Sequence, residues 1–155
     1  MKPYTLTIDI DVPRDLVIEL FDDPDNLQMW QPGLQSWILT SGERGQVGAE
    51  ASIVFMDGSR RIEMTERITS RNLPNEFSGT YEWGGNTNSV VNRFFELGPE
   101  QTRWEIECAY TLNSLKMKLM GMVMGGKFKA EHLKFMQAFK AFCEDGTDVR
   151  TGDPG

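Results

Sequence analysis

Apolar and polar residues alternate strictly at the start of the chain. From residue 4 to residue 12 every even-numbered position is apolar, and threonine or aspartate fills the positions between. This period of two predicts a half-buried strand over Tyr4–Val12. Pro13 and then Asp23-Pro24 are residue types that begin helices, so we expect two short helices after this strand, the second over Pro24–Gln31.

Six further strand-like segments follow, each closed by residues typical of turns. Because these turns recur at regular spacing with no helical pattern between them, they predict an antiparallel meander. Alternation along the segments predicts one covered and one solvent-facing side of the sheet. The predicted strands are Ser36–Ser41, Ala49–Met56, Arg60–Ser70, Glu76–Trp83, Ser89–Leu97 and Thr102–Leu112.

The hydrophobic period changes in the last third of the chain, where large side chains recur at intervals of three and four and share one helical face. These residues are Phe128, His132, Phe135, Phe139 and Phe142. We expect a helix from a cap at Ser114 to about Glu144, either continuous or broken at Gly125-Gly126, with a loop preceding a shorter helix from Lys127 as the alternative.

Together these elements predict an α+β domain. A sheet with one solvent-facing side must cover its other side, and the C-terminal helix is the one predicted element long enough to do so. The length of 155 residues fits a single domain, which we place at residues 1–145. Residues 146–155 are polar and contain three glycines and a proline, so we expect a disordered tail.

Charge and hydropathy exclude several classes of partner. The net charge of −7 argues against a nucleic-acid-binding face. No apolar segment approaches the roughly 20 residues of a membrane helix, so we expect no stable membrane insertion. The alternating N-terminus does not resemble a signal peptide. We therefore expect a cytoplasmic protein, either a monomer or a homodimer.

The catalytic inventory is small. The single histidine, His132, cannot build a multi-histidine metal site, and Cys108 and Cys143 form no CxxC motif. The sequence contains neither a glycine-rich loop with nucleotide-binding spacing nor a GxSxG elbow. These observations predict no metal and no cofactor.

Several features together resemble the START/Bet v 1-like (SRPBCC) superfamily, in particular its polyketide cyclase/dehydrase-like branch. They are the opening strand, the helix entry Val12–Val17, the segments Asp23–Leu27 and Trp30–Leu34, the spaced glycines Gly42, Gly45 and Gly48, and the amphipathic C-terminal helix. The resemblance covers about residues 3–144. It implies a helix-grip fold, in which a curved seven-stranded antiparallel sheet wraps around the long C-terminal helix and two short helices follow strand 1.

Members of this superfamily commonly hold a hydrophobic cavity between the sheet and the helix. The resemblance therefore implies binding or carriage of a small hydrophobic ligand of lipid, polyketide or aromatic type. A cyclase- or dehydratase-type enzyme acting in the same cavity, without metal or nucleotide cofactor, is the first alternative. The second is a protein-interaction module like the chaperone-activating relatives, which would need a contiguous exposed apolar patch.

Candidate ligand-binding residues come from the apolar faces and from a methionine cluster near Gly121, because methionine adapts to varied apolar shapes. Methionine also fills ordinary cores, and Trp30 with Trp37 could close a pocket mouth or form a small aromatic core instead. The predicted set is Trp30, Trp37, Met64, Tyr81, Tyr110, Met117, Met120, Met124, Phe128, His132 and Phe135.

Four polar residues are candidates for acid–base chemistry. His132 lies in the phenylalanine stripe, as a core histidine or as a ligand contact. Glu66 shares its phase with apolar residues, unless a strand end or bulge turns it to water. Arg93 would point inward and pair with Glu66 or an anionic ligand, unless a phase slip presents Asn92 instead. Tyr81 completes the set.

Overall fold

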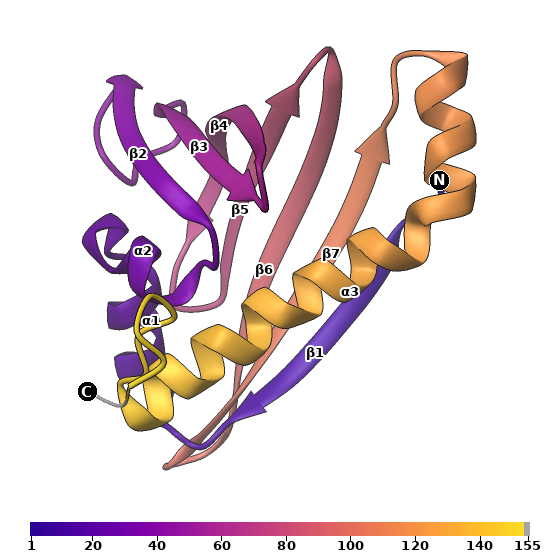
Figure 1. Ribbon diagram of the computed structural model, residues 1–155. Helices are drawn as coiled ribbons and strands as arrows, with labels where there is room; N and C mark the ends of the chain where they lie inside the picture. Colours follow the sequence, from indigo (N-terminus) through magenta and orange to yellow (C-terminus); the bar gives the residue numbers. More distant parts are fainter. Residues whose placement is uncertain (154–155) are drawn as a thin grey trace.

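The computed structural model describes residues 1–153 and confirms the predicted order of elements (Figure 1). The sequence predicts the number of strands and the short helices after strand 1, the second of which corresponds to a 3₁₀ helix followed directly by one α-helical turn. The elements are β1 (Tyr4–Ile10), α1 (Arg14–Phe21), the 3₁₀ helix η1 (Pro24–Asn26), α2 (Leu27–Trp30), β2 (Leu34–Ser41), β3 (Glu50–Asp57), β4 (Arg60–Asn72), β5 (Glu76–Trp83), β6 (Asn86–Gly98), β7 (Gln101–Thr111) and α3 (Leu115–Asp145).

The seven strands form one antiparallel sheet in the order β1-β7-β6-β5-β4-β3-β2. Strands β2 to β7 follow one another as a meander, and β1 pairs with β7. A hairpin at Asp57-Gly58, a dipeptide typical of tight hairpin turns, joins β3 to β4, and Gly58 has a φ of 62°, a left-handed conformation that favours glycine.

Both predicted side-chain caps are confirmed. Asp23 Oδ1 accepts a hydrogen bond from the Asp25 backbone N–H at 2.9 Å and begins η1. Ser114 Oγ accepts from the Met117 backbone N–H at 3.1 Å and begins α3. Each bond satisfies one of the backbone donors that the first turn of a helix leaves without a partner.

α3 is continuous from Leu115 to Asp145, so the alternative of a loop before Lys127 is wrong. Figure 1 shows the helix changing direction along its length, with the orange N-terminal part steeper than the long remainder. Gly121 is buried, and a Cβ there would lie 2.7 Å from Leu112 Cδ1. Close packing against the Leu112 side chain, which directly follows β7, therefore accounts for this glycine.

α3 crosses the concave side of the sheet and makes its main backbone contacts with β1 and α2 (Figure 1). We call the side of the sheet turned toward α3 the inner face. Its residues are identified by alternation, since the buried positions of β1, β6 and β7 that pack toward the helix are even-numbered.

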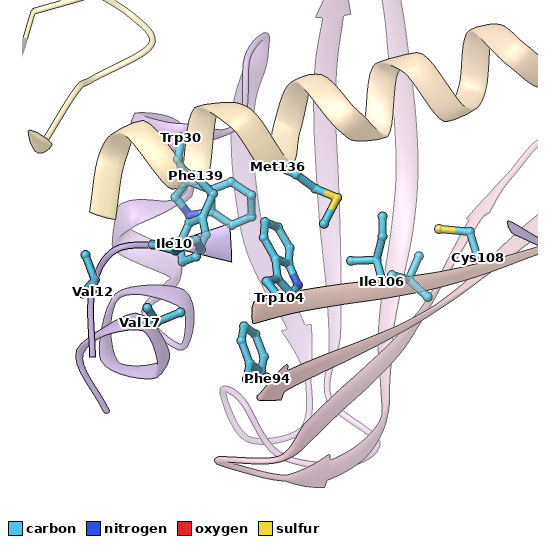
Figure 2. Close-up of a cluster of buried hydrophobic side chains, with 11 residues drawn as sticks. Ile10, Val12, Val17, Trp30, Phe94, Trp104, Ile106, Cys108, Met136 and Phe139 are labelled. Atoms are coloured by element: carbon cyan, nitrogen blue, oxygen red, sulfur yellow. The ribbon is translucent and has the colours of Figure 1, made fainter. Parts of the chain in front are cut away.

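The closed core lies where the C-terminal half of α3 meets α1, α2 and the ends of β6 and β7. Figure 2 shows Met136 and Phe139 of α3 pointing toward Trp104 of β7, with Phe94 of β6 beneath it. The Phe139 ring centroid lies 4.8 Å from that of Trp30 and 5.0 Å from that of Trp104. Burial of these rings supplies much of the hydrophobic stabilisation at this end of the domain.

Residues 146–153 turn back against α2, where the Val149 backbone N–H donates to the Met29 carbonyl at 2.8 Å. Pro154 and Gly155 of the predicted tail lie outside the described residues. The domain boundary at residue 145 and the disorder of the tail stay predictions. None of the helices in residues 1–153 has both the length and the apolar character needed to cross a membrane.

Candidate functional site

Four polar side chains meet where β1 and β7 pass beneath α3. The Tyr4 hydroxyl contacts His132 Nδ1 and lies 3.1 Å from the Tyr110 hydroxyl. Cys108 Sγ lies 3.5 Å from the same His132 nitrogen. Residue 4 stands directly opposite residue 108 in the β1–β7 register, which explains why the two side chains reach the same histidine. We call these four residues the tyrosine–histidine cluster.

Burial keeps every member of this cluster uncharged near neutral pH. It lowers the pKa of His132 to about 4 and raises those of Cys108 and Tyr110 to about 12. Burial also raises the pKa of Tyr4. Because a neutral imidazole accepts at one nitrogen, we infer that the Tyr4 O–H donates to Nδ1 and its oxygen accepts from Tyr110.

A second polar group lies across the sheet. Glu66 is on the inner face of β4, and its Oε1 accepts a hydrogen bond from Trp37 Nε1 at 3.0 Å. The irregularity in the β4–β5 register falls between Ile68 and Ser70, so it does not turn Glu66 to water. Burial, and then the nearby Glu66 carboxylate, raise the pKa of Tyr81 well above its ordinary value.

The strand register connects the two groups. Glu66 is opposite Tyr81, Tyr81 is opposite Asn88, and Asn88 is opposite Tyr110. These four residues form a row across β4, β5, β6 and β7 on the inner face, spanning three strand spacings of about 4.8 Å each. The row leads from Trp37 and Glu66 to the tyrosine–histidine cluster. We call it the cross-sheet polar row.

Aromatic side chains of α3 cover part of this face. Phe128 stacks on Tyr110 with ring centroids 5.5 Å apart, and Phe135 lies 5.8 Å from Phe55 of β3. Met64 of β4 is half-buried on the same face, opposite Ile53. Three of the predicted ligand-binding methionines, Met117, Met120 and Met124, are half-buried on the N-terminal part of α3.

Trp30 is separated from these residues. It is 4% exposed in the closed core, between Phe21 and Phe139. This is the aromatic core that the sequence offered as the alternative to a pocket mouth. Trp37 does lie on the inner face, so the structure does not bring the two tryptophans together.

Of the two phases that the sequence leaves open for this strand, the structure has Asn92 inward, so the inward orientation of Arg93 is wrong. Its guanidinium lies on the outer face, 2.9 Å from Glu107, 3.1 Å from Glu105 and 3.4 Å from Glu76. Segment 89–97 has apolar residues in both phases, and the even-numbered phase with Asn92 is the buried one. Arg93 therefore cannot pair with Glu66, whereas His132, Glu66 and Tyr81 do share the inner face.

This correction predicts the behaviour of an Arg93→Gln variant. We expect the free energy of unfolding to fall by about 1 kcal/mol, because the ion pairs are partly exposed and three carboxylates lose their shared partner. Binding of any inner-face ligand should be unchanged. Urea unfolding and a ligand titration test both points, and a large loss of binding would contradict the outward placement.

Some residues of the inner face were missed from the sequence. The sequence marks Tyr4 as a strand position and Cys108 as a strand position outside any CxxC motif, with no signal that either contacts His132, and Asn88 lies outside the predicted strand. An exposed apolar stripe on the N-terminal part of α3 was also missed. The stripe consists of Leu115, Leu119, Met122 and Val123. These residues follow one another at intervals of four, three and one, and this spacing is the signal in the sequence that could have identified the stripe.

Two hollows open elsewhere on the surface. One of about 350 Å³ lies at the β5–β6 turn, residues 82–87, and one of about 450 Å³ lies beside Arg14, Asn75 and Arg93. Neither contains a predicted ligand-binding residue. Within residues 1–153, no group of three or more metal-ligating side chains is arranged to hold a metal ion.

Comparison with solved structures confirms the helix-grip, Bet v 1-like fold. Ara h 8.0201 is 9% identical, with a TM-score of 0.69 over 92% of this chain and 97% of that one. A conserved Geobacillus kaustophilus protein is 15% identical, with a TM-score of 0.73 over 92% and 95%. The Zhui aromatase/cyclase of Streptomyces sp. R1128 is 12% identical, with a TM-score of 0.69 over 92% and 93%.

Sequence comparison extends this likeness from the fold to a family. No curated protein matches the chain. The model of one family, described as polyketide cyclase/dehydrase and lipid transport, matches residues 1–144. That match covers the whole sheet and all but the last residue of α3. The chain therefore belongs to the polyketide cyclase/dehydrase and lipid transport family, within the SRPBCC superfamily that its sequence resembles.

Proposed function

We propose that this protein binds or carries a small apolar ligand between α3 and the β3–β5 part of the inner face. The observation that carries the proposal is the incomplete burial of large inner-face side chains. These are Phe55, Ile62, Met64, Tyr81, Trp83, Phe128 and Phe135, all half-buried. Side chains of this size normally close a core, so their residual exposure marks a surface suited to an apolar guest.

The position of α3 supports this location. The helix makes its main backbone contacts with β1 and α2, at one side of the sheet, and its C-terminal half is sealed by Phe139 and Met136. Strands β3 to β5 are reached mainly by long side chains such as Phe135. Lipid, polyketide and aromatic molecules are the ligand types that family membership suggests.

The test is a pair of adjacent substitutions on β4. Met64 is on the inner face, whereas Thr65 is exposed on the outer face. We expect Met64→Lys to weaken binding of the uncharged fluorescent probe N-phenyl-1-naphthylamine at least about tenfold, since a lysine introduces a charge that an apolar ligand cannot solvate. Thr65→Lys carries the same charge and should bind within about twofold of the unaltered protein.

Circular dichroism and the thermal midpoint establish that both variants are folded. Equal affinities of the two folded variants, or no probe binding by the unaltered protein, would contradict the proposal.

An enzyme of cyclase or dehydratase type is the second candidate. It is favoured by the placement of His132 and Tyr4 on the same face as Tyr81 and Glu66. Such chemistry would rest on positioning and on these acid–base groups, without metal or nucleotide. Conversion of a bound polyketide-type probe that disappears in His132→Gln while binding persists would favour this candidate.

The protein-interaction alternative requires an exposed apolar patch, and the stripe from Leu115 to Val123 on α3 is such a patch. Loss of a partner with Leu119→Ser, and unchanged probe binding, would favour this alternative. The cytoplasmic location and the monomeric or homodimeric state stay predictions from the sequence.

A further inference from the structure

Three asparagines of β6 point into the inner face in the same phase. Asn86, Asn88 and Asn92 are 4%, 6% and 7% exposed. A buried amide loses its hydrogen bonds to water and needs protein partners in their place. The three residues have nearly equal burial and identical chemistry, so the partners of each amide reveal its role.

The side-chain oxygens of two of the asparagines accept hydrogen bonds from the protein itself. Asn92 Oδ1 accepts from Trp104 Nε1 at 3.0 Å, and its Nδ2 donates to the Phe77 carbonyl at 3.2 Å. Asn86 Oδ1 accepts from the Asn113 backbone N–H at 3.0 Å. These bonds join β6 to its neighbours and to the segment that precedes α3. Asn86 and Asn92 are therefore structural.

Asn88 is different, because its buried Oδ1 has no partner in the described protein. Its backbone is fixed in the sheet between Tyr81 and Tyr110, so its side chain projects from the centre of the cross-sheet polar row. Both flanking tyrosines are half-buried. Tyr81 belongs to β5, in the part of the inner face where we place the ligand, and Asn88 is on the adjacent strand β6. The unpaired Asn88 Oδ1 is therefore suited to accept a hydrogen bond from a donor group of a bound ligand.

The charged groups around Asn88 restrict the type of ligand that can bind beside it. Glu66 is two strands away in the same row, and Arg93, the cation that the sequence offers as a partner for an anionic ligand, lies on the outer face. His132 is neutral, since burial lowers its pKa to about 4. A carboxylate placed beside the amide oxygen would thus meet another acceptor and a like charge, with no cation among these neighbours to offset them.

We propose that Asn88 Oδ1 accepts a hydrogen bond from a hydroxyl or N–H group of the bound molecule, so that the site selects uncharged apolar ligands with a donor, such as phenols and alcohols, over ethers and carboxylates. This inference rests on the proposed function, and it adds the class of ligand and the residue that selects it.

The experiment compares three probes that share one ring system. 2-Naphthol has a donor, 2-methoxynaphthalene has none, and 2-naphthoate is an anion. We expect the unaltered protein to bind 2-naphthol about tenfold more tightly than the other two. In Asn88→Leu this preference should fall to within about twofold. Asn88→Ala, which adds no volume, should lose the preference in the same way.

Asn92→Leu is the matched control for folding. It removes bonds to Trp104 and Phe77, so its thermal midpoint should fall, whereas that of Asn88→Leu should stay equal or rise. A midpoint of Asn88→Leu that falls as far as that of Asn92→Leu would assign Asn88 a structural role and overturn the inference.

The binding outcomes separate this inference from the proposed function. Equal affinity for all three probes, or a preference that survives in both Asn88 variants, would overturn the role of Asn88 alone. Tighter binding of 2-naphthoate would overturn the uncharged class. If none of the probes binds, the proposed function itself fails.

Discussion

Replacing Phe139 by alanine is expected to lower the free energy of unfolding by about 3–5 kcal/mol. The side chain is 0% exposed, and its ring meets Trp30, Trp104 and Phe21 at centroid distances of 4.8, 5.0 and 5.9 Å. Truncation removes these contacts and leaves a cavity that rigid aromatic neighbours cannot fill. The loss is a large fraction of the stability of an ordinary domain, and urea unfolding measures it.

Phe135→Ala is the matched control, one helical turn earlier on the same face. Phe135 is half-buried, and its ring contact is with Phe55 at 5.8 Å. We expect the Phe135→Ala variant to lose only about 1–2 kcal/mol of unfolding free energy, because less apolar surface returns to water. Equal losses at the two positions would mean that α3 is packed uniformly along its length, which would contradict a closed core at one end and an accessible inner face at the other.

The stability of the protein is expected to fall steeply with acid because of His132. Burial lowers the pKa of this histidine from about 6.5 to about 4, so the unfolded chain binds a proton at a higher pH than the folded protein does. The stability that comes from keeping His132 neutral in the folded protein is fully present above about pH 6.5 and is lost as the pH falls toward 4. A shift of this size corresponds to about 3 kcal/mol.

His132→Gln isolates this contribution, because glutamine keeps an acceptor for Tyr4 but does not titrate. Carboxylates with lowered pKa values, such as Asp9 beside Arg103, respond to acid equally in both proteins. Urea unfolding measures the free energy of unfolding at pH 7 and at pH 4. The decrease between these two pH values should therefore be about 3 kcal/mol smaller in the variant than in the unaltered protein. Parallel losses in the two proteins would mean that His132 is hydrated in the folded state.

The fold follows from signals that are local in the sequence. Alternation from Tyr4 onward, the hairpin at Asp57-Gly58 and the caps at Asp23 and Ser114 each depend on residues only a few positions apart. The order of the predicted elements then permits few fold topologies, because the single long helix must cover one face of the meander sheet. The strand order and the short helices were predictable for this reason.

The site was harder to predict because its contacts are long-range. Tyr4 and His132 are 128 residues apart, and only the β1–β7 register with the position of α3 brings them together. The sequence leaves the face of Arg93 open between two phases because Val90, Val91, Phe94 and Phe95 give apolar residues in both. The asparagines of β6 are buried although a polar residue in a strand normally indicates the solvent-facing side. Their polarity therefore suggested the opposite face from the one that the structure shows.

The central claim is that an apolar ligand binds on the inner face between α3 and strands β3 to β5. The nine methionines provide built-in probes, because each methyl group gives an NMR signal that single Met→Leu variants assign. Half-buried Met64 faces the proposed site, whereas Met29 lies on α2 and Met122 is exposed on α3.

Titration with N-phenyl-1-naphthylamine, followed by the methionine methyl signals, is the most direct measurement. The account predicts that the signal of Met64 shifts and saturates with the probe, while those of Met29 and Met122 stay in place. A probe that binds and shifts Met29 or Met122 but leaves Met64 unchanged would contradict it.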